Sequence, residues 1–346
     1  MSVREKIDIR TMTREQLEQY FREGGESAFR GRQVYQWLWE KSVQGFEDMS
    51  NLSLKIREQL DRDFEIRAIT VDKEQFSTDK TIKSAFRLHD QHLIEGVLIP
   101  ATHRMTACVS SQVGCSLSCK FCATGYMERQ RNLDYPEIYD QVVHIRNQAL
   151  QHYEKPLTNI VFMGMGEPLL NYQNVLQAIN RITSPQGLGM AARRITVSTA
   201  GIAKMIHKLA QDEVRFNLAL SLHAANDQKR SEIMPINDSN SLESLISALL
   251  EFYRVTGNHI TLEYIVFNNF NDSLDDAAEL LRFARQIPCK INLIEYNPIN
   301  EARFTNARED KIALFGDFLR SKGVNVNIRR SRGKDIDAAC GQLANK

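Results

Sequence analysis

The sequence predicts an α/β fold with a parallel sheet, preceded by a small helical domain and a short β-rich linker. Three observations support this prediction. Residues 12–65 follow a helical pattern, residues 66–100 are rich in β-forming residues, and strand-like and helix-like segments alternate from there onward. Alternating units of this kind place helices outside a parallel sheet. We therefore expect a helical accessory domain at 1–65, a β linker at 66–100 and a core domain at 101–346.

The helical domain contains a helix start and a mixed basic and aromatic stretch. Thr13 and Gln16 match a capping box, a pattern that begins helices. The stretch 28–41 then combines arginines with Trp37 and Trp39. Such a mixture can contact RNA phosphates and stack on bases. It can also fill a small helical core, and the pattern alone favours the core for both tryptophans.

The linker and the core contain short runs that we expect to be strands. Two linker runs, at 82–88 and 93–99, are separated by a polar turn and predict a small sheet that bridges the two domains. In the core, the number of strand–helix units is six, fewer than the eight of a closed barrel. The six core strands are expected at Met105–Ser110, Asn159–Met163, Ile195–Ser198, Phe216–Leu222, Ile260–Phe267 and Lys290–Tyr296. Helices are expected near 134–152, 171–183, 202–211, 241–255 and 273–286, the fourth with Asn240 as its N-cap.

Composition and charge exclude some classes of protein and leave others open. The 346 residues are 42% hydrophobic and 25% charged, as in ordinary soluble proteins. The N-terminus is too charged for a signal peptide, and no apolar stretch approaches the roughly 20 residues of a membrane helix. We therefore expect a cytoplasmic protein without membrane association, in which cysteines are thiols or metal ligands. The formal net charge of +1 neither supports nor excludes a nucleic-acid partner.

Three of the six cysteines, Cys115, Cys119 and Cys122, lie within eight residues of one another. Thiolates favour zinc, copper(I) or iron–sulfur clusters over hard cations. A structural zinc site normally takes four protein ligands. Three thiolates instead suit a 4Fe–4S cluster whose fourth iron is open to another ligand. The spacing therefore favours a cluster over zinc, and both over a disulfide.

This C-x-x-x-C-x-x-C run, with Phe121 before its last thiol, resembles the signature of the radical S-adenosylmethionine (radical SAM) enzymes. In that family the open iron binds the amino and carboxylate groups of SAM. An electron from the cluster then cleaves SAM to a 5′-deoxyadenosyl radical. The resemblance implies a 4Fe–4S cluster, SAM and an open, partial (β/α)6 radical SAM barrel, which agrees with the six units.

Functional residues of parallel barrels gather at the C-terminal ends of strands. The second core strand ends at Gly164-Met165-Gly166-Glu167, where glycines let a ligand approach the backbone. A dinucleotide fingerprint would need a third glycine in place of Leu169. The resemblance implies instead that Gly166 and Glu167 hold the amino group of SAM.

Further candidate SAM contacts follow the third, fourth and sixth core strands. Taken singly, serines at strand ends often satisfy only backbone groups, and a lone histidine is more often structural. Their shared location beside the cluster favours a role in binding ribose, adenine or carboxylate. These candidates are Ser198, Ser221, Leu222, His223 and Asn297.

Cys108 and Cys340, taken alone, can be inert thiols or a fourth cluster ligand. Several stretches together, however, resemble the RlmN/Cfr family of radical SAM RNA methyltransferases, and the helical N-terminal domain fits that family as well. These stretches are Gln112–Cys122, Met163–Leu170, Ser221–Ala224, Met234–Asn237, Tyr296–Pro298 and Ala338–Leu343.

The family resemblance implies a reaction that uses two SAM molecules. Cys340 takes a methyl group from the first, which requires its thiolate. The radical from the second abstracts hydrogen from the S-methyl group, and the resulting carbon radical adds to carbon 2 of an adenine, forming a covalent protein–RNA adduct. Glu95, which by pattern alone can equally be an outward-facing strand residue, matches the general base that removes the ring proton. Cys108 then attacks Cys340, releasing the methylated base and leaving a transient disulfide.

The resemblance also implies the substrates, namely adenosine 2503 of 23S ribosomal RNA before full ribosome assembly, and adenosine 37 of transfer RNA. We expect a monomer that takes electrons from a donor such as flavodoxin. Two basic clusters, Arg193-Arg194 and residues 329–334, are candidate phosphate contacts or simply solvated charge. One alternative is an enzyme acting on carbon 8 of the same adenine, which Glu167-Pro168 and the short segment after Cys340 disfavour. The other is a non-catalytic RNA-binding protein with a structural metal.

Overall fold

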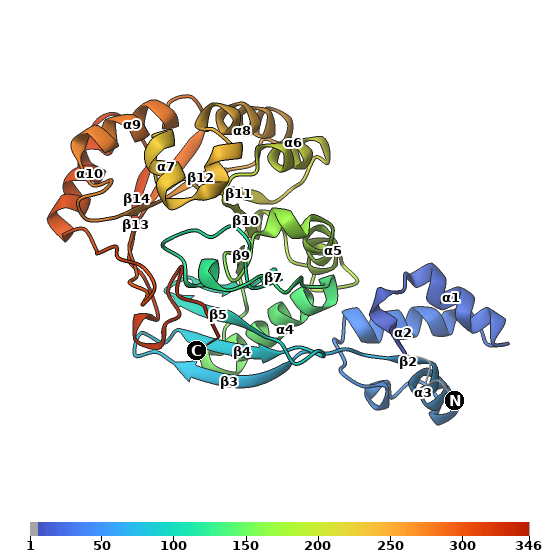
Figure 1. The fold of residues 1–346 in the computed structure, drawn as a ribbon. Helices are drawn as coiled ribbons and strands as arrows, with labels where there is room; N and C mark the ends of the chain where they lie inside the picture. The colour runs from blue at the N-terminus through green and yellow to red at the C-terminus, as the bar shows by residue number, and fades with distance from the viewer. Residues whose placement is uncertain (1–5, 346) are drawn as a thin grey trace.

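The N-terminal part of the chain is helical, as predicted, and its first helix begins at the predicted capping box (Figure 1). The structure, a computed structural model, describes residues 6–345. Thr13 and Gln16 form the predicted capping box, in which Thr13 Oγ1 accepts from the Gln16 N–H at 3.2 Å. Two short strands pair in parallel and bring the ends of this helical unit together. The unit consists of β1 (Ile7–Asp8), α1 (Arg14–Glu23), α2 (Phe29–Trp39), α3 (Leu54–Asp63) and β2 (Phe64–Glu65).

The helical unit packs on the first core helix, α4 (Tyr135–Tyr153), through aromatic rings. Trp39, only 1% exposed, stacks on Tyr135 with ring centroids 5.6 Å apart and meets Tyr139 edge-on at 5.1 Å. Trp37 is partly exposed, and its indole N–H donates to a side chain within the unit. The predicted core role is therefore confirmed for Trp39, whereas Trp37 lies at the edge of the core.

One sheet of ten strands runs through the rest of the molecule, in the order β14-β13-β12-β11-β10-β9-β6-β5-β4-β3. The linker strands do not form a separate bridging sheet, which corrects that prediction. They continue the core sheet because β5 pairs with β6, placing Val97 opposite Cys108. The antiparallel part comprises β3 (Thr70–Phe76), β4 (Ile82–Arg87), β5 (Leu93–Ala101) and β6 (Arg104–Cys108).

The parallel part contains the six predicted units, and its two outer strands do not pair with each other, so the barrel is open. β14 is an additional parallel strand that was not predicted. The parallel strands after β6 are β9 (Asn159–Phe162), β10 (Ile195–Thr199), β11 (Asn217–Ser221), β12 (Ile260–Val266), β13 (Cys289–Glu295) and β14 (Val326–Arg329). The helices after α4 are α5 (Tyr172–Thr183), α6 (Ala203–Gln211), α7 (Asp227–Ile233), α8 (Leu242–Thr256), α9 (Leu274–Ala284) and α10 (Glu309–Ser321).

Two local details differ from the prediction. Ser241, and not Asn240, caps α8, since its Oγ accepts from the Ser244 N–H at 3.3 Å. Asn240 instead accepts from the Ala203 N–H at 2.9 Å and so links α8 to α6. None of the helices in residues 6–345 has both the length and the apolar character of a membrane-spanning segment.

Candidate functional site

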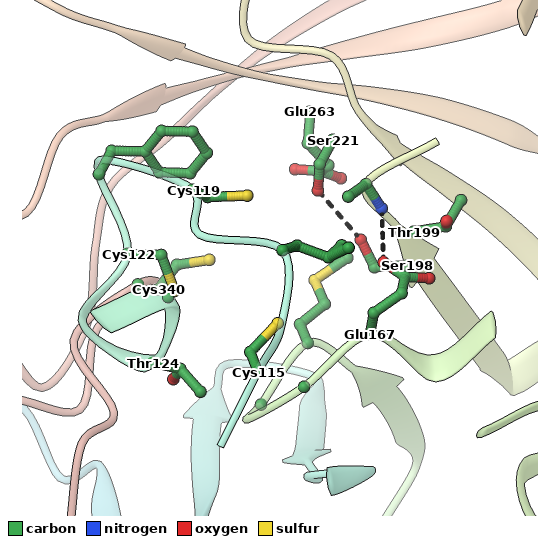
Figure 2. A pocket seen from close by; sticks show the side chains of 18 of the residues that line it. Cys115, Cys119, Cys122, Thr124, Glu167, Ser198, Thr199, Ser221, Glu263 and Cys340 are labelled. Carbon is green, nitrogen blue, oxygen red and sulfur yellow. Dashed lines mark hydrogen bonds between the residues drawn. The ribbon is translucent and has the colours of Figure 1, made fainter. Parts of the chain in front are cut away.

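A cavity lies at the C-terminal ends of the parallel strands, where functional residues were expected (Figure 2). With its open mouth it encloses about 930 Å³, within the range of cofactor sites. Its wall combines the cysteine loop, the ends of β9–β13 and the C-terminal segment. The predicted site residues in this wall are Cys115, Cys119, Cys122, Gly166, Glu167, Ser198, Ser221, His223 and Cys340.

The other predicted residues lie outside this wall. Cys108 lines a neighbouring cavity of about 640 Å³, which also contains Cys340. The carbonyl of Leu222 accepts from Arg230 Nε at 3.1 Å. The side-chain amide of Asn297 donates to the Cys340 carbonyl at 3.1 Å, so it supports the C-terminal segment.

The cysteine loop is a tight turn closed at its base by the paired strands β7 (Gln112–Val113) and β8 (Arg131–Asn132). The Cys122 N–H donates to the Cys119 carbonyl at 3.2 Å. Gly125 must be a glycine, because a Cβ there would lie 2.7 Å from the same carbonyl oxygen. Figure 2 shows the sulfur atoms of the three loop cysteines facing the space that Glu167 and Ser198 border.

The donor set of this loop fits an iron–sulfur cluster. Burial raises the pKa of all three thiols, that of Cys115 to about 11, so a bound metal must displace their protons. Within residues 6–345, no three His, Cys, Asp or Glu side chains converge as the ligands of one ion do. All three thiols line the same cavity. A cluster that takes each thiolate on a different iron matches this arrangement.

Glu167 is buried, and no cationic side chain in the described part of the chain forms an ion pair with its carboxylate. Its Oε2 accepts from the Ala200 N–H at 2.7 Å, and its Oε1 accepts from the Leu169 N–H at 3.0 Å. Burial raises the pKa of Glu167 to about 7. Gly166 precedes it with φ 91°, and a Cβ there would lie 2.5 Å from Gln112. The turn therefore places one carboxylate in the cavity wall, where a positively charged ligand would stabilise its ionised form.

His223 is a neutral imidazole with a defined tautomer. Its Nδ1 accepts from the Ile265 N–H at 3.1 Å, so Nε2 carries the proton. Burial, together with the nearby Arg230, lowers the pKa of His223 to about 3. Its ring meets Phe121 edge-on, with centroids 4.7 Å apart. This contact ties the fourth strand end to the cysteine loop.

Arg230, on α7, is a functional candidate that the sequence did not reveal. It is fully buried and donates to the carbonyls of Ala200, Ser221 and Leu222. These carbonyls end β10 and β11, where the two serines of the cavity wall approach each other with Oγ atoms 3.4 Å apart. Arg230 therefore fixes the strand ends that carry these serines.

Glu263 was also missed, and Arg329 was named only as a candidate phosphate contact. Glu263 lines the cavity, and its Oε2 lies 3.2 Å from Arg329 Nη1. A single carboxylate within the otherwise uncharged strand Ile260–Val266 was a signal that could have revealed it. Arg329 in turn lines the second cavity with Cys108 and Cys340.

Glu95 is buried and faces the C-terminal segment instead of solvent, so the outward-facing alternative is wrong. Its Oε1 lies 3.1 Å from Lys83 Nζ, another residue that the sequence did not reveal. Its Oε2 accepts from the backbone N–H groups of Ala344 and Asn345 at 2.8 and 3.1 Å.

Both basic clusters are weak candidates for phosphate contacts near the cavity. The four cations of residues 329–334 are engaged in ion pairs, for example Lys334 with Glu295 at 2.9 Å and Arg330 with Glu309 at 2.6 Å. Arg193 and Arg194 precede β10, at the end of the strand opposite the cavity.

Two family models match the chain. The model of the ribosomal RNA large subunit methyltransferase N-terminal domain matches residues 7–66, and the model of the radical SAM superfamily matches residues 109–284. The first covers the helical unit, and the second covers the cysteine loop and most of the parallel sheet.

Full-length relatives are similar over nearly the whole chain. A probable dual-specificity RNA methyltransferase RlmN of Cytophaga hutchinsonii is 61% identical, with 98% of this chain and 93% of that protein covered. A dual-specificity RNA methyltransferase RlmN of Geotalea uraniireducens is 42% identical, with 98% and 97% covered. The crystal structure of a radical SAM methyltransferase from Sphaerobacter thermophilus superposes with a TM-score of 0.93 at 38% identity, covering 98% of this chain and 100% of that one.

Proposed function

The chain belongs to the RlmN family of radical SAM RNA methyltransferases, and from this premise we propose that it methylates carbon 2 of an adenine. The proposed substrates are adenosine 2503 of 23S ribosomal RNA, before full ribosome assembly, and adenosine 37 of transfer RNA. The names of the relatives, which describe dual-specificity enzymes, support two RNA substrates.

Radical SAM enzymes use SAM and a 4Fe–4S cluster, and we propose that the three loop cysteines hold the cluster. When bound, cluster and SAM supply a 5′-deoxyadenosyl radical that abstracts hydrogen. Glu167 is available to the amino group of SAM, because it is buried and no lysine or arginine among residues 6–345 forms an ion pair with it. The other proposed SAM contacts are Gly166, Ser198, Ser221 and His223 in the cavity wall, together with Leu222 and Asn297, which lie just outside this wall.

The position of Cys340 is the single observation that supports this function best. Cys340 lines the cavity of the loop cysteines and also the cavity of Cys108. A thiol in that position can receive a methyl group from SAM in one cavity and meet the second thiol in the other. A simple methyltransferase, or a structural metal site, needs no such pair of thiols.

In the proposed reaction, Cys340, Glu95 and Cys108 each carry out one step. Carbon 2 of adenine is electron-poor and cannot attack SAM, so its new carbon must arrive on the protein. The Cys340 thiolate attacks the methyl carbon of one SAM, and S-adenosylhomocysteine leaves. A second SAM, bound with the cluster, would supply the radical that takes a hydrogen atom from this S-methyl group. The carbon radical on Cys340 adds to carbon 2, and the adduct then loses the ring proton to Glu95 and one electron, which the oxidised cluster would accept. Cys108 attacks the Cys340 sulfur, and the bond from that sulfur to the transferred carbon breaks. This carbon takes up a proton and becomes the methyl group, and the two cysteines are left as a disulfide that must be reduced.

Replacing each thiol in turn tests this proposal. Cys108→Ala is expected to leave RNA covalently attached through Cys340, visible as a slow band on a denaturing gel. Cys340→Ala is expected to abolish methyl transfer while the protein retains its iron. Free RNA and normal turnover in the first variant contradict the mechanism. Loss of iron in the second would make Cys340 a cluster ligand instead.

The position of the new methyl group is tested separately. RNA from cells with and without the gene is digested to nucleosides, and the methyladenosine isomers are separated by chromatography and mass spectrometry. We expect 2-methyladenosine in ribosomal RNA and in transfer RNA. The carbon 8 isomer would assign the chain to the alternative reaction. Methylation of one RNA only would reject the dual specificity.

The remaining partners follow from this reaction. We propose that the protein is cytoplasmic, because its RNA substrates are in the cytoplasm, and that it acts as a monomer. The cluster must be reduced before SAM is cleaved, and the disulfide must be reduced afterwards. We propose a small electron-transfer protein such as flavodoxin as the electron donor of the cluster.

A further inference from the structure

The carboxylate of Glu95 has two kinds of partner, one on a strand and one on the chain end. Lys83 Nζ lies 3.1 Å from Oε1, and both side chains are almost fully buried, at 2% and 1% exposure. Within residues 6–345, Oε1 receives no directed hydrogen bond, and Lys83 is its one ion-pair partner there. Oε2 is bound by the Ala344 and Asn345 N–H groups. One oxygen of Glu95 therefore contacts a side chain on β4, and the other accepts from the backbone of the C-terminal tail.

Lys83 is fixed relative to the thiol chemistry by strand register. It pairs with Val97 across β4 and β5, and Val97 pairs with Cys108 across β5 and β6. These three residues therefore form one row on one face of the sheet, since directly paired side chains share a face. Glu95, two residues before Val97, is on that face as well. Lys83, Glu95 and Cys108 consequently face the same interior space.

A buried ion pair of this kind needs a reason beyond stability. Removing two charges from water costs about as much as their attraction returns, and an apolar pair of similar volume is often as stable. Val97, which pairs with Lys83 on the same face, is apolar and buried, so this face of the sheet accommodates apolar side chains. Breaking such a pair, in contrast, leaves an uncompensated buried charge.

The tail that binds Oε2 is the segment that carries Cys340. The cysteine loop holds it through the Ala123 N–H, which donates to the Gly341 carbonyl at 2.7 Å, and through Thr124 Oγ1, which donates to the Leu343 carbonyl at 2.6 Å. Asn345 also donates to the Leu93 carbonyl at 2.8 Å. While these bonds are intact, the tail fills the space in front of the Glu95 carboxylate.

We propose that Lys83 is the permanent positioning residue of Glu95, and that the tail N–H groups of Ala344 and Asn345 occupy the carboxylate only until the RNA adenine displaces them. The inference rests on the proposed role of Glu95 as the base. Lys83 stays against the Glu95 carboxylate throughout the catalytic cycle, whereas the tail leaves the carboxylate when the adenine binds. Docked tail and docked adenine are therefore alternatives at the same oxygen, and Cys340 is coupled to this exchange through its own segment.

The first test replaces Lys83 in the full-length, cluster-loaded protein. Lys83→Met is compared with Lys83→Arg and with Lys73→Met, an exposed lysine on the adjacent β3. The Lys83→Met variant is expected to methylate Cys340 and to form 5′-deoxyadenosine within about twofold of the parent, because both events precede proton removal. Its yield of methyladenosine is expected to fall about tenfold or more while covalent protein–RNA adduct accumulates. Lys83→Arg restores most of the yield, and Lys73→Met matches the parent.

Two results overturn the role of Lys83. One is normal methyladenosine formation in Lys83→Met with iron content and melting temperature unchanged. The other is a loss of Cys340 methylation, 5′-deoxyadenosine and methyladenosine in equal proportion, which is the mark of a merely structural residue. The Cys108→Ala variant with Lys83 intact separates this role from the proposed function. If that variant forms no protein–RNA adduct, the proposed function itself is contradicted.

A second test addresses the tail without using turnover. Ala344→Pro deletes one N–H donor to Glu95, and Ala344→Ser keeps it. In the absence of RNA, we expect the Asn345 amide, which also donates to Glu95, to exchange its hydrogen about tenfold faster in Ala344→Pro than in the parent, because the neighbouring hydrogen bond to the carboxylate is lost. Exchange is read from the mass of the tail peptide, and Ala344→Ser is expected to match the parent. Equal exchange rates in all three proteins contradict the exchangeable tail.

Discussion

Glu167 is poised between its two protonation states at neutral pH. Burial raises its pKa to about 7, although two backbone N–H groups favour the charged form. A bound cation would shift the balance toward the carboxylate. The protonation state of Glu167 therefore depends on whether a positively charged group occupies the cavity.

This shift predicts a pH-dependent stability in the cofactor-free protein. The folded pKa of about 7 is above the ordinary value of 4.5, so the folded state holds the proton more tightly. The resulting stability is complete below pH 4.5 and is lost as pH rises through 7. Relative to Glu167→Gln, the wild-type free energy of unfolding should therefore fall by about 3 kcal/mol over this range. Urea unfolding of both proteins at several pH values measures this, and a constant difference contradicts it.

The sequence could reveal site residues that share one stretch of chain with a recognisable spacing. The three loop cysteines and Gly166-Glu167 are of this kind, and all lie in the cavity wall. Lys83 could not be recognised, because its role depends on the register between β4 and β5 and on a tail far along the chain. The charge of a strand lysine does not reveal which side of the sheet it faces.

At the scale of elements, the cysteine loop and the C-terminal segment are held together by a few hydrogen bonds. Thr124 donates to the Leu343 carbonyl at 2.6 Å, and Thr124 is itself buried. Gln342 adds a bond to the Pro298 carbonyl at 3.1 Å beyond β13. The position of Cys340 between two cavities therefore depends on contacts from the cysteine loop and from the end of β13.

Thr124→Val is expected to loosen the segment while keeping the shape of the side chain. It removes the hydroxyl and leaves the Leu343 carbonyl without that donor, which costs about 1–3 kcal/mol. Hydrogen exchange of the tail amides should become faster by about tenfold or more, and Thr124→Ser should restore slow exchange. Unchanged exchange in Thr124→Val would show that other contacts alone hold the segment.

Arg230 of α7 holds the ends of β10 and β11 through hydrogen bonds to their carbonyls. Arg230→Met leaves the carbonyls of Ala200, Ser221 and Leu222 without this donor, so the free energy of unfolding should fall by about 3 kcal/mol or more. SAM affinity, measured by calorimetry on the cluster-loaded protein, should fall about tenfold or more because the serines move. Arg282→Met, on the surface of α9, is the control and should change neither quantity. Tight SAM binding in a destabilised Arg230→Met contradicts the link.

Helices and strands were predictable to different degrees. α4, α5, α6, α8 and α9 each begin within two residues of the expected start, because apolar periodicity and caps are local signals. β3 was missed since its side chains are almost all exposed at the sheet edge and show no apolar alternation. Leu250 and Tyr253 continue the apolar stripe of α8, and both are exposed. The apolar stripe of a helix can therefore be wider than the face that it buries.

At the scale of the molecule, the helical unit and the sheet share an interface that only the fold reveals. Arg10 of the unit is buried and pairs with Asp8 at 3.0 Å and with Asp140 of α4 at 2.7 Å. Arg181 of α5 lies over the rings of Tyr35 and Trp39, 5.0 Å from each centroid. The contacts of Arg10 with Asp140 and of Arg181 with the two rings join residues more than a hundred positions apart, so no local pattern could predict them.

The two tryptophans of α2 separate the structural role of this unit from an RNA-binding role. Trp39 is buried against α4, and Trp39→Ala should lower the free energy of unfolding by about 3–5 kcal/mol. Trp37 is partly exposed, so Trp37→Ala should cost much less, about 1 kcal/mol. If the unit stacks on RNA, the exposed ring is the one that contacts a base, and Trp37→Ala should weaken binding of a 23S RNA fragment by about fivefold or more. Binding is measured at fixed salt by filter retention. Equal unfolding costs contradict the assigned interface, and unchanged RNA affinity in Trp37→Ala excludes stacking by this residue.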